Sequence, residues 1–320
     1  MEPREPRHPL VTVAGPTGSG KSTLAQHLAG RFAGEIVNCD SLQLYRGFDI
    51  GTAKTPLADR GQVPHHLFDV LTPQESYSAG EYAHAARAII ADISARGRLP
   101  IVVGGTGFYL RALLDGLPAL PERDDPLRAR LLARESVRPG SLHRILVRLD
   151  PLAAARIHAR DVQKTLRALE VRLLTQRAMP PPADARPLEG FAIVKLGLDP
   201  DRTELHRRLE ARTSAMFEYG LVEEVRGLLA HGAAGDEKPF ESLGYKQAVL
   251  YLRGSLTREE AITSTLIETR QYAKRQWTWF RRDYAIHWLR GFGDEAEIIA
   301  QAAQAIAQLS QARTLLRYSN

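Results

Sequence analysis

Short apolar runs alternate with longer helix-like segments along most of the chain, which is the pattern of an α/β fold. The apolar runs end at turns that contain glycine or aspartate. Runs that are apolar throughout indicate strands buried on both faces, as in parallel sheets. Strands are predicted at Leu10–Ala14, Glu35–Cys39, Leu99–Val103, Phe191–Leu198 and Ala285–Leu289, with a short one inside Pro64–Asp69.

Helix-like segments separate these strands, so we predict a parallel sheet flanked by helices. Ser78 and Glu81 have the spacing of a capping box and mark the start of one helix. Another helical stretch starts near Ser242. The remaining helices are predicted at Ser22–Phe32, Tyr82–Arg96, Asp201–Tyr219, Leu221–His231 and Thr257–Arg282, with an alanine-rich helix from Ala296.

The middle of the chain has a different pattern, because it contains helix-like segments and prolines but no strand. Proline residues stand at both ends of this stretch, at Pro118, Pro121 and Pro126 and again at Pro180–Pro182. We therefore predict a catalytic core from residues 1–120 and 191–320, and a helical insertion domain at residues 121–190. Its helices are expected at Asp125–Glu135, Ser141–Leu149, Pro151–Ala159 and Asp161–Gln176.

The composition is that of a globular protein, with 44% hydrophobic and 25% charged residues in 320. No apolar run is long enough to cross a bilayer, and Met1–Pro9 is polar and rich in proline, so a cytoplasmic location without membrane contact is expected. The single cysteine, Cys39, allows neither an intramolecular disulfide nor a cysteine zinc cluster. Any metal is expected to be Mg²⁺ held by oxygen and phosphate.

Positive charge is concentrated in the predicted insertion. The whole chain has a formal net charge of +6, and residues 121–190 hold 14 Arg and Lys against 9 Asp and Glu, a net charge of +5. Such an excess fits a polyanionic partner, but it also fits a solvated helix face rich in arginine. Charge alone leaves both interpretations open.

A phosphate-binding loop follows the first predicted strand. Residues 15–22 match the pattern G-x-x-x-x-G-K-[ST] and are followed by a helix, which is the required context. Backbone N–H groups of such a loop surround phosphate oxygens, Lys21 reaches the outer phosphate, and Ser22 can ligate Mg²⁺. The predicted phosphate ligands are Gly15, Pro16, Thr17, Gly18, Ser19, Gly20, Lys21 and Ser22.

Other candidate residues follow neighbouring strands. Asp40 comes directly after the second strand, and Thr106 belongs to the glycine-rich turn after Val103. Because the carboxyl ends of parallel strands share one edge of a sheet, both are expected near the phosphate loop. Arg226 lies on a predicted helix from which it could reach the phosphates, although a surface arginine is equally consistent. These features fit a small-molecule or nucleotide kinase with a lid, or a transferase whose leaving group is a diphosphate.

An ordered set of motifs resembles the tRNA dimethylallyltransferase family. The resemblance extends from about Val11 to Trp288, with Gly18 where many members have alanine and Lys246 where many have arginine. The sequence lacks the cysteine–histidine zinc module of eukaryotic family members, and in this respect it resembles the bacterial members. The motifs are Gly15–Ser22, Asp40–Tyr45, Asp49–Lys54, Val103–Thr106, Gln163–Glu170, Gly244–Gln247 and Thr269–Trp279.

The resemblance implies a P-loop NTPase-like fold and the transfer of a dimethylallyl group from dimethylallyl diphosphate to tRNA. The acceptor is the exocyclic amine, N6, of the adenosine on the 3′ side of the anticodon. Asp40, Thr106 and Arg226 are the implied catalytic residues, with Asp40 as general base, Mg²⁺ as cofactor and a monomer as the expected state.

The resemblance also implies that the adenosine leaves the anticodon stack and that the insertion grips the anticodon stem. The residues expected to contact tRNA are Asp40, Ser41, Leu42, Gln43, Thr106, Arg128, Gln163, Lys164, Thr165, Leu166, Arg167, Lys274, Arg275, Gln276, Trp277 and Arg281. The spacing of Trp277 and Phe280, three residues apart, also predicts that these two are core side chains.

Overall fold

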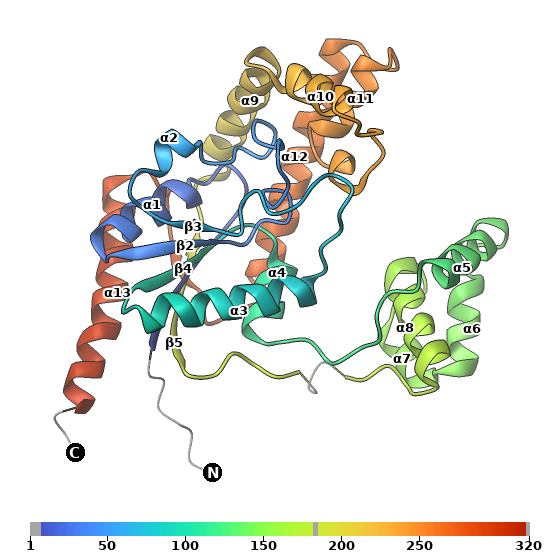
Figure 1. Ribbon diagram of the computed structural model, residues 1–320, viewed down its shortest axis with the longest axis horizontal. Coiled ribbons are helices and arrows are strands. Elements are labelled where there is room, and N and C mark those ends of the chain that lie inside the picture. Colours follow the sequence, from blue (N-terminus) through green and yellow to red (C-terminus); the bar gives the residue numbers. More distant parts are fainter. Residues whose placement is uncertain (1–7, 182–184, 318–320) are drawn as a thin grey trace. The chain divides into compact units, whose positions relative to one another are not determined.

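The computed structural model of the chain (Figure 1) describes residues 8–181 and 185–317, with backbone only for residues 309–317. Residues 1–7 and Pro182, which belong to the predicted polar N-terminus and the predicted proline joint, lie outside the described residues. The chain divides into two compact units. The first comprises Met1–Leu114 and Leu188–Asn320, and the second comprises Asp115–Pro187, where the sequence predicts an insertion at residues 121–190.

The first unit contains a six-stranded sheet, in which the strands pair in parallel in the order β3-β2-β4-β1-β5-β6. The predicted α/β class with a parallel sheet is confirmed. β1 lies at the centre of the sheet, between β4 and β5. The strands β2, β3 and β4 lie on one side of β1, and β5 and β6 lie on the other side. The strands are β1 (His8–Ala14), β2 (Gly34–Asn38), β3 (His65–His66), β4 (Leu99–Val103), β5 (Phe191–Leu198) and β6 (His287–Leu289).

The helices of this unit agree with the sequence pattern except in two places. The sequence analysis did not predict α2, which is a single turn, or α4, which is a helix of eight residues. The helices are α1 (Lys21–Arg31), α2 (Leu57–Arg60), α3 (Ala79–Ala95), α4 (Gly107–Leu114), α9 (Arg202–Glu218), α10 (Leu221–Ala230), α11 (Tyr245–Leu252), α12 (Arg258–Phe280) and α13 (Ala296–Arg317), with a 3-10 turn at Lys238–Glu241.

Apolar side chains hold these helices to the sheet. Leu24 and Leu28 of α1 and Ile298 of α13 pack against Val11 and Ile101 in one core. The predicted capping box on α3 is present, since the Ser78 side chain accepts from the Glu81 N–H and the Glu81 carboxylate accepts from the Ser78 N–H.

In its described residues, the second unit has four helices, α5 (Asp125–Val137), α6 (Ser141–Leu149), α7 (Pro151–Arg156) and α8 (Val162–Thr175). Its core includes Leu142, Leu146, Ala153, Leu166 and Leu169. None of the helices in the part of the chain that the structure describes is both long and apolar enough to cross a membrane.

Candidate active site

The phosphate loop joins β1 to α1, as the motif predicts. Gly20 has a φ of +83° and caps α1, and a Cβ there would lie 2.9 Å from the Gly293 nitrogen, so a side chain is excluded on both grounds. The first-turn N–H groups of α1 have no intrahelical acceptor and point toward the loop. The buried Ser19 hydroxyl has no hydrogen-bond partner among the described residues. The loop therefore has donor groups to offer an anion.

Lys21 lies inside this loop, where its ammonium group donates to the Pro16 carbonyl over 2.8 Å. Burial lowers the pKa of Lys21 to about 8, the Asp40 carboxylate opposes this effect, and the Arg212 guanidinium adds to it. Lys21, Asp40 and Arg212 therefore share one electrostatic environment. A bound anion would restore the charged form of Lys21.

Asp40 is held by the residue that ends β2. The fully buried Asn38 side chain accepts from the Asp40 N–H over 2.9 Å and donates to the carbonyls of Asp40 and Leu67, over 3.0 and 2.8 Å. One Asp40 carboxylate oxygen accepts from the Leu42 N–H over 3.0 Å. No described residue donates a hydrogen bond to the other oxygen, so it can accept one from a ligand.

Thr106 lies beside Asp40, as predicted from the order of the strands. Its hydroxyl oxygen accepts from the Ser41 N–H over 3.1 Å, and its own N–H donates to the Cys39 carbonyl over 3.2 Å. Tyr272 of α12 closes this side, and its pKa is raised by burial and by the Asp40 carboxylate. The site thus sets a carboxylate and a hydroxyl beside an anion-binding loop.

Gln276 of α12 connects the two glycine-rich turns. Its amide oxygen accepts from the Thr17 N–H over 2.7 Å, and its amide nitrogen donates to the Gly105 carbonyl over 3.0 Å. The side chain is buried. The sequence analysis predicts that Gln276 contacts tRNA. In the structure its amide group instead connects the two loops by hydrogen bonds and is not exposed for such a contact.

The arginine at the loop is Arg212, which the sequence analysis missed. It lies on α9 and donates to the Thr17 hydroxyl over 3.4 Å, and burial lowers its pKa while Asp40 raises it. The predicted residue, Arg226, is exposed on α10 and pairs with Glu223 over 3.3 Å. Packing of Leu205 and Leu209 turns Arg212 toward the loop, whereas the sequence pattern of α9 only marks it as one of several basic residues.

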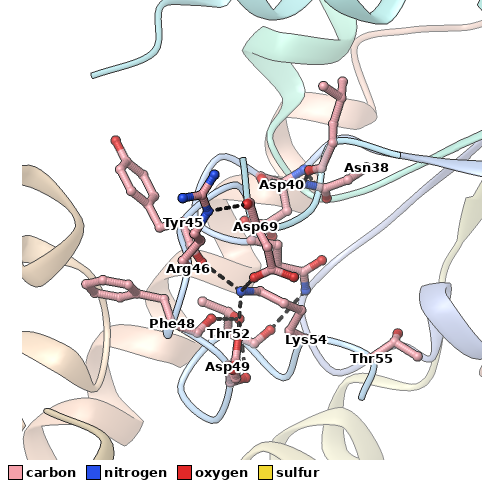
Figure 2. A network of polar contacts seen from close by, with 12 residues as sticks. Asn38, Asp40, Tyr45, Arg46, Phe48, Asp49, Thr52, Lys54, Thr55 and Asp69 are labelled. Carbon is pink, nitrogen blue, oxygen red and sulfur yellow. Dashed lines mark hydrogen bonds and ion pairs between the residues drawn. The ribbon is translucent and has the colours of Figure 1, made fainter. Parts of the chain in front are cut away.

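An ion-pair network around the buried Lys54 side chain supports the segment after Asp40 (Figure 2). Lys54 donates to the Tyr45 carbonyl and to the carboxylates of Asp49 and Asp69, over 2.6 to 2.7 Å, with a nearly fully buried side chain. From the opposite direction, Glu224 of α10 accepts from the N–H groups of Asp49 and Ile50. The Asp49–Lys54 motif therefore acts as a brace for the turn that carries the predicted tRNA contacts.

The other predicted tRNA contacts of the first unit occupy different environments. Ser41, Leu42 and Gln43 are partly exposed in the turn after Asp40. Lys274, Arg275 and Arg281 are exposed on or just after α12. Trp277 instead packs against the core formed by Leu205, Leu209, Ala273 and Phe292, so most of its ring is unavailable for a base.

In the second unit, Gln163 and Lys164 are exposed on α8, whereas Thr165 and Leu166 are buried. Arg128 and Arg167 both bind the fully buried carboxylate of Glu170. Their charges are thus partly used within the unit, which the basic composition of the sequence does not reveal.

We predict that Arg212→Ala raises the Kd of inorganic diphosphate, measured calorimetrically with Mg²⁺, about tenfold or more, because a charge-assisted contact is lost. Arg226→Ala is the matched control and should change that Kd less than about twofold, since its partner is Glu223. An unchanged Kd in Arg212→Ala would contradict the assignment of Arg212, and a loss in Arg226→Ala would return Arg226 to the binding site.

A second prediction concerns pH. The ratio of diphosphate affinities between the wild-type protein and Lys21→Met should be constant below pH 8 and fall about tenfold per pH unit above it, because the neutral lysine must then take up a proton on binding. Taking the ratio removes the titration of diphosphate itself. A ratio that stays constant up to about pH 9.5 would show that Lys21 keeps its proton in the free protein, and would contradict the lowered pKa.

Comparisons with known proteins agree with this geometry. The family model described as IPP transferase matches residues 43–283. A tRNA dimethylallyltransferase of Solibacter usitatus is 60% identical over 302 residues, covering 94% of this chain and 98% of the relative.

Solved structures give the same result. The full-length tRNA isopentenylpyrophosphate transferase of Bacillus halodurans is 35% identical, with a TM-score of 0.73 and coverage of 98% of this chain and 100% of that one. A eukaryotic dimethylallyltransferase acting on tRNA is 29% identical, with a TM-score of 0.75 and coverage of 88% and 74%. The P-loop NTPase-like fold is therefore confirmed, and this chain belongs to the IPP transferase family.

Proposed function

We propose that this protein transfers the dimethylallyl group of dimethylallyl diphosphate to N6 of the adenosine on the 3′ side of a tRNA anticodon. The observation that carries the proposal is the position of Asp40 next to the phosphate loop and two cations, Lys21 of the loop and Arg212 of α9. The names of the relatives support this transferase over the alternative, a small-molecule or nucleotide kinase.

On the donor side, the bond between the allylic carbon and the diphosphate oxygen breaks, and positive charge develops on the carbon. The departing diphosphate takes the electron pair, so groups that stabilise its charge lower the barrier. The N–H groups of the loop, Lys21 and Arg212 are suited to this task. They also hold the donor in a fixed orientation, which reduces the entropic part of the barrier.

Mg²⁺ is part of the proposal, and the residues present fit it. Ser22 is exposed in the first turn of α1, and its hydroxyl makes no hydrogen bond with a described residue. No group of three or more His, Cys, Asp or Glu side chains suited to a metal occurs in the described residues. Mg²⁺ that bridges substrate phosphates needs few protein ligands, and Ser22 would hold it. Bound there, the ion would neutralise part of the diphosphate charge.

On the acceptor side, the N6 amine forms the new bond to carbon and loses one proton. The free carboxylate oxygen of Asp40 accepts that proton as general base. Thr106, fixed by the Ser41 N–H, presents its hydroxyl to the same position and orients the base. Atoms balance, since the products are the alkylated adenosine, diphosphate and one proton on Asp40.

For the tRNA itself, exposed basic side chains supply phosphate contacts. Lys274, Arg275 and Arg281 near the end of α12 suit this role in the first unit, and Lys164 suits it in the second, where the neutral amide of Gln163 is exposed beside it. The grip of the helical unit on the anticodon stem, the monomeric state and the cytoplasmic location stay predictions from the sequence.

A paired labelling experiment tests the function. Purified protein with Mg²⁺ and an unmodified tRNA that has adenosine 3′ of its anticodon receives either labelled dimethylallyl diphosphate or γ-labelled ATP. We expect label to enter tRNA from the prenyl donor alone. Transfer of label only from ATP to an acceptor would contradict the proposal and make the protein a kinase.

A further inference from the structure

Two aromatic rings and one arginine form an exposed cluster immediately after Thr106. Phe108 and Arg111 lie three residues apart on α4 and therefore on one face of this helix. The opposite face, with Tyr109 and Leu113, is buried. Phe108 is 44% exposed, a high value for a phenylalanine beside a reactive edge.

The third member is Trp279, near the end of α12, which is 37% exposed. Its ring lies against the backbone of Gly107, where a Cβ would be 2.2 Å from the indole ring, so this glycine is needed for the contact. The Arg111 guanidinium carbon lies 5.4 Å from the Phe108 ring centroid and 5.8 Å from that of Trp279. The arginine thus lies near both rings and tends to hold them in place.

Neither the phosphate loop nor the chemistry at Asp40 uses this cluster. Arg111 has no carboxylate partner among the described residues, so its charge is available to a ligand. Exposed aromatic rings combined with an unpaired guanidinium are the groups that stack on unpaired nucleobases and contact their phosphates. Trp277, the aromatic residue that the sequence selects for tRNA, packs in a core instead.

We propose that Phe108, Arg111 and Trp279 form a stacking site for one of the two nucleobases that flank the target adenosine. The inference rests on the proposed function and extends it to a subsite of the same reaction. When the adenosine leaves the anticodon stack, its neighbours lose a stacking partner. The cluster begins at Phe108, two residues after Thr106, which places it within reach of the next nucleotide, where it replaces the lost partner.

The test measures binding of a tRNA anticodon stem-loop. Phe108→Ala should raise the Kd about tenfold on the intact RNA, through the loss of one stacking surface. Phe108→Leu keeps an apolar side chain and should also weaken binding, whereas Tyr284→Ala removes a 98% exposed ring elsewhere and should have no effect. The Kd of inorganic diphosphate should be unchanged in all three variants, which excludes a disturbed phosphate loop.

Abasic RNAs identify the base. On a stem-loop abasic at one of the two flanking positions, the effect of Phe108→Ala should disappear, because the partner is already absent. An effect of equal size on the intact RNA and on both abasic RNAs would overturn the proposal, as would a change below about twofold on the intact RNA. Arg111→Gln should lower the slope of log Kd against log salt by about 0.7, and Phe108→Ala should leave it unchanged.

These outcomes are separable from the proposed function. Because they measure RNA binding, they hold whether or not the wild-type protein transfers a prenyl group. Wild-type transfer without any effect of Phe108→Ala on binding would overturn the stacking site and leave the transferase intact. If the wild-type protein fails to transfer the prenyl group but the abasic RNAs give the expected result, the proposed transferase function is overturned and the stacking site is kept.

Discussion

The positive charge gathered at the phosphate loop is the constraint on which the site depends. Lys21 and Arg212 lie close enough for each to affect the other, and burial lowers the pKa of both. Asp40 compensates only in part, since one carboxylate faces two cations. A charged group removed from water is costly unless it is paired, so the arrangement favours a bound anion of high charge. Diphosphate meets that requirement, and its departure in the reaction returns the loop to its unpaired state.

The order of the strands explains why the acceptor groups meet this charge. β2, β4 and β1 are neighbours, so Asp40, Thr106 and the loop leave one edge of the sheet side by side. Helices from the end of the chain then close the edge, because α9 supplies Arg212 and α12 supplies Gln276. The hydrogen bonds and ion pairs of the buried Lys54 side chain support the turn after Asp40 (Figure 2). Each reactive group is therefore positioned by contacts distant in sequence.

The sequence predicts the parts that depend on local pattern. The phosphate loop, the strand before Asp40 and the capping box at Ser78 have short-range signals, and all are present in the structure. It could not select Arg212 over Arg226, because both lie on amphipathic helices and only packing in three dimensions decides which guanidinium reaches Thr17.

Burial is the other property that the sequence pattern conceals. Gln276 and Trp277 lie among basic residues on α12, a setting typical of an RNA-binding surface, although the spacing of Trp277 and Phe280 also predicts a core position for the tryptophan. In the structure, one joins two loops and the other packs in a core. Phe108 is the opposite case. An apolar residue close to the end of a buried strand is typical of a core side chain, so the sequence pattern does not indicate that Phe108 is exposed. In the structure, Tyr109 and Leu113 form the buried face of α4, and Phe108 lies outside that face.

The central claim is that Asp40 accepts the amine proton, and single-turnover transfer by Asp40→Asn tests it most directly. This variant keeps the shape and the hydrogen bond from Leu42 but removes the base. With the tRNA and donor bound before the reaction starts, we predict a rate about 100-fold or more below wild type. The Kd for tRNA should change less than about threefold, because the lost group acts mainly in the transition state. A single-turnover rate close to wild type would contradict the account.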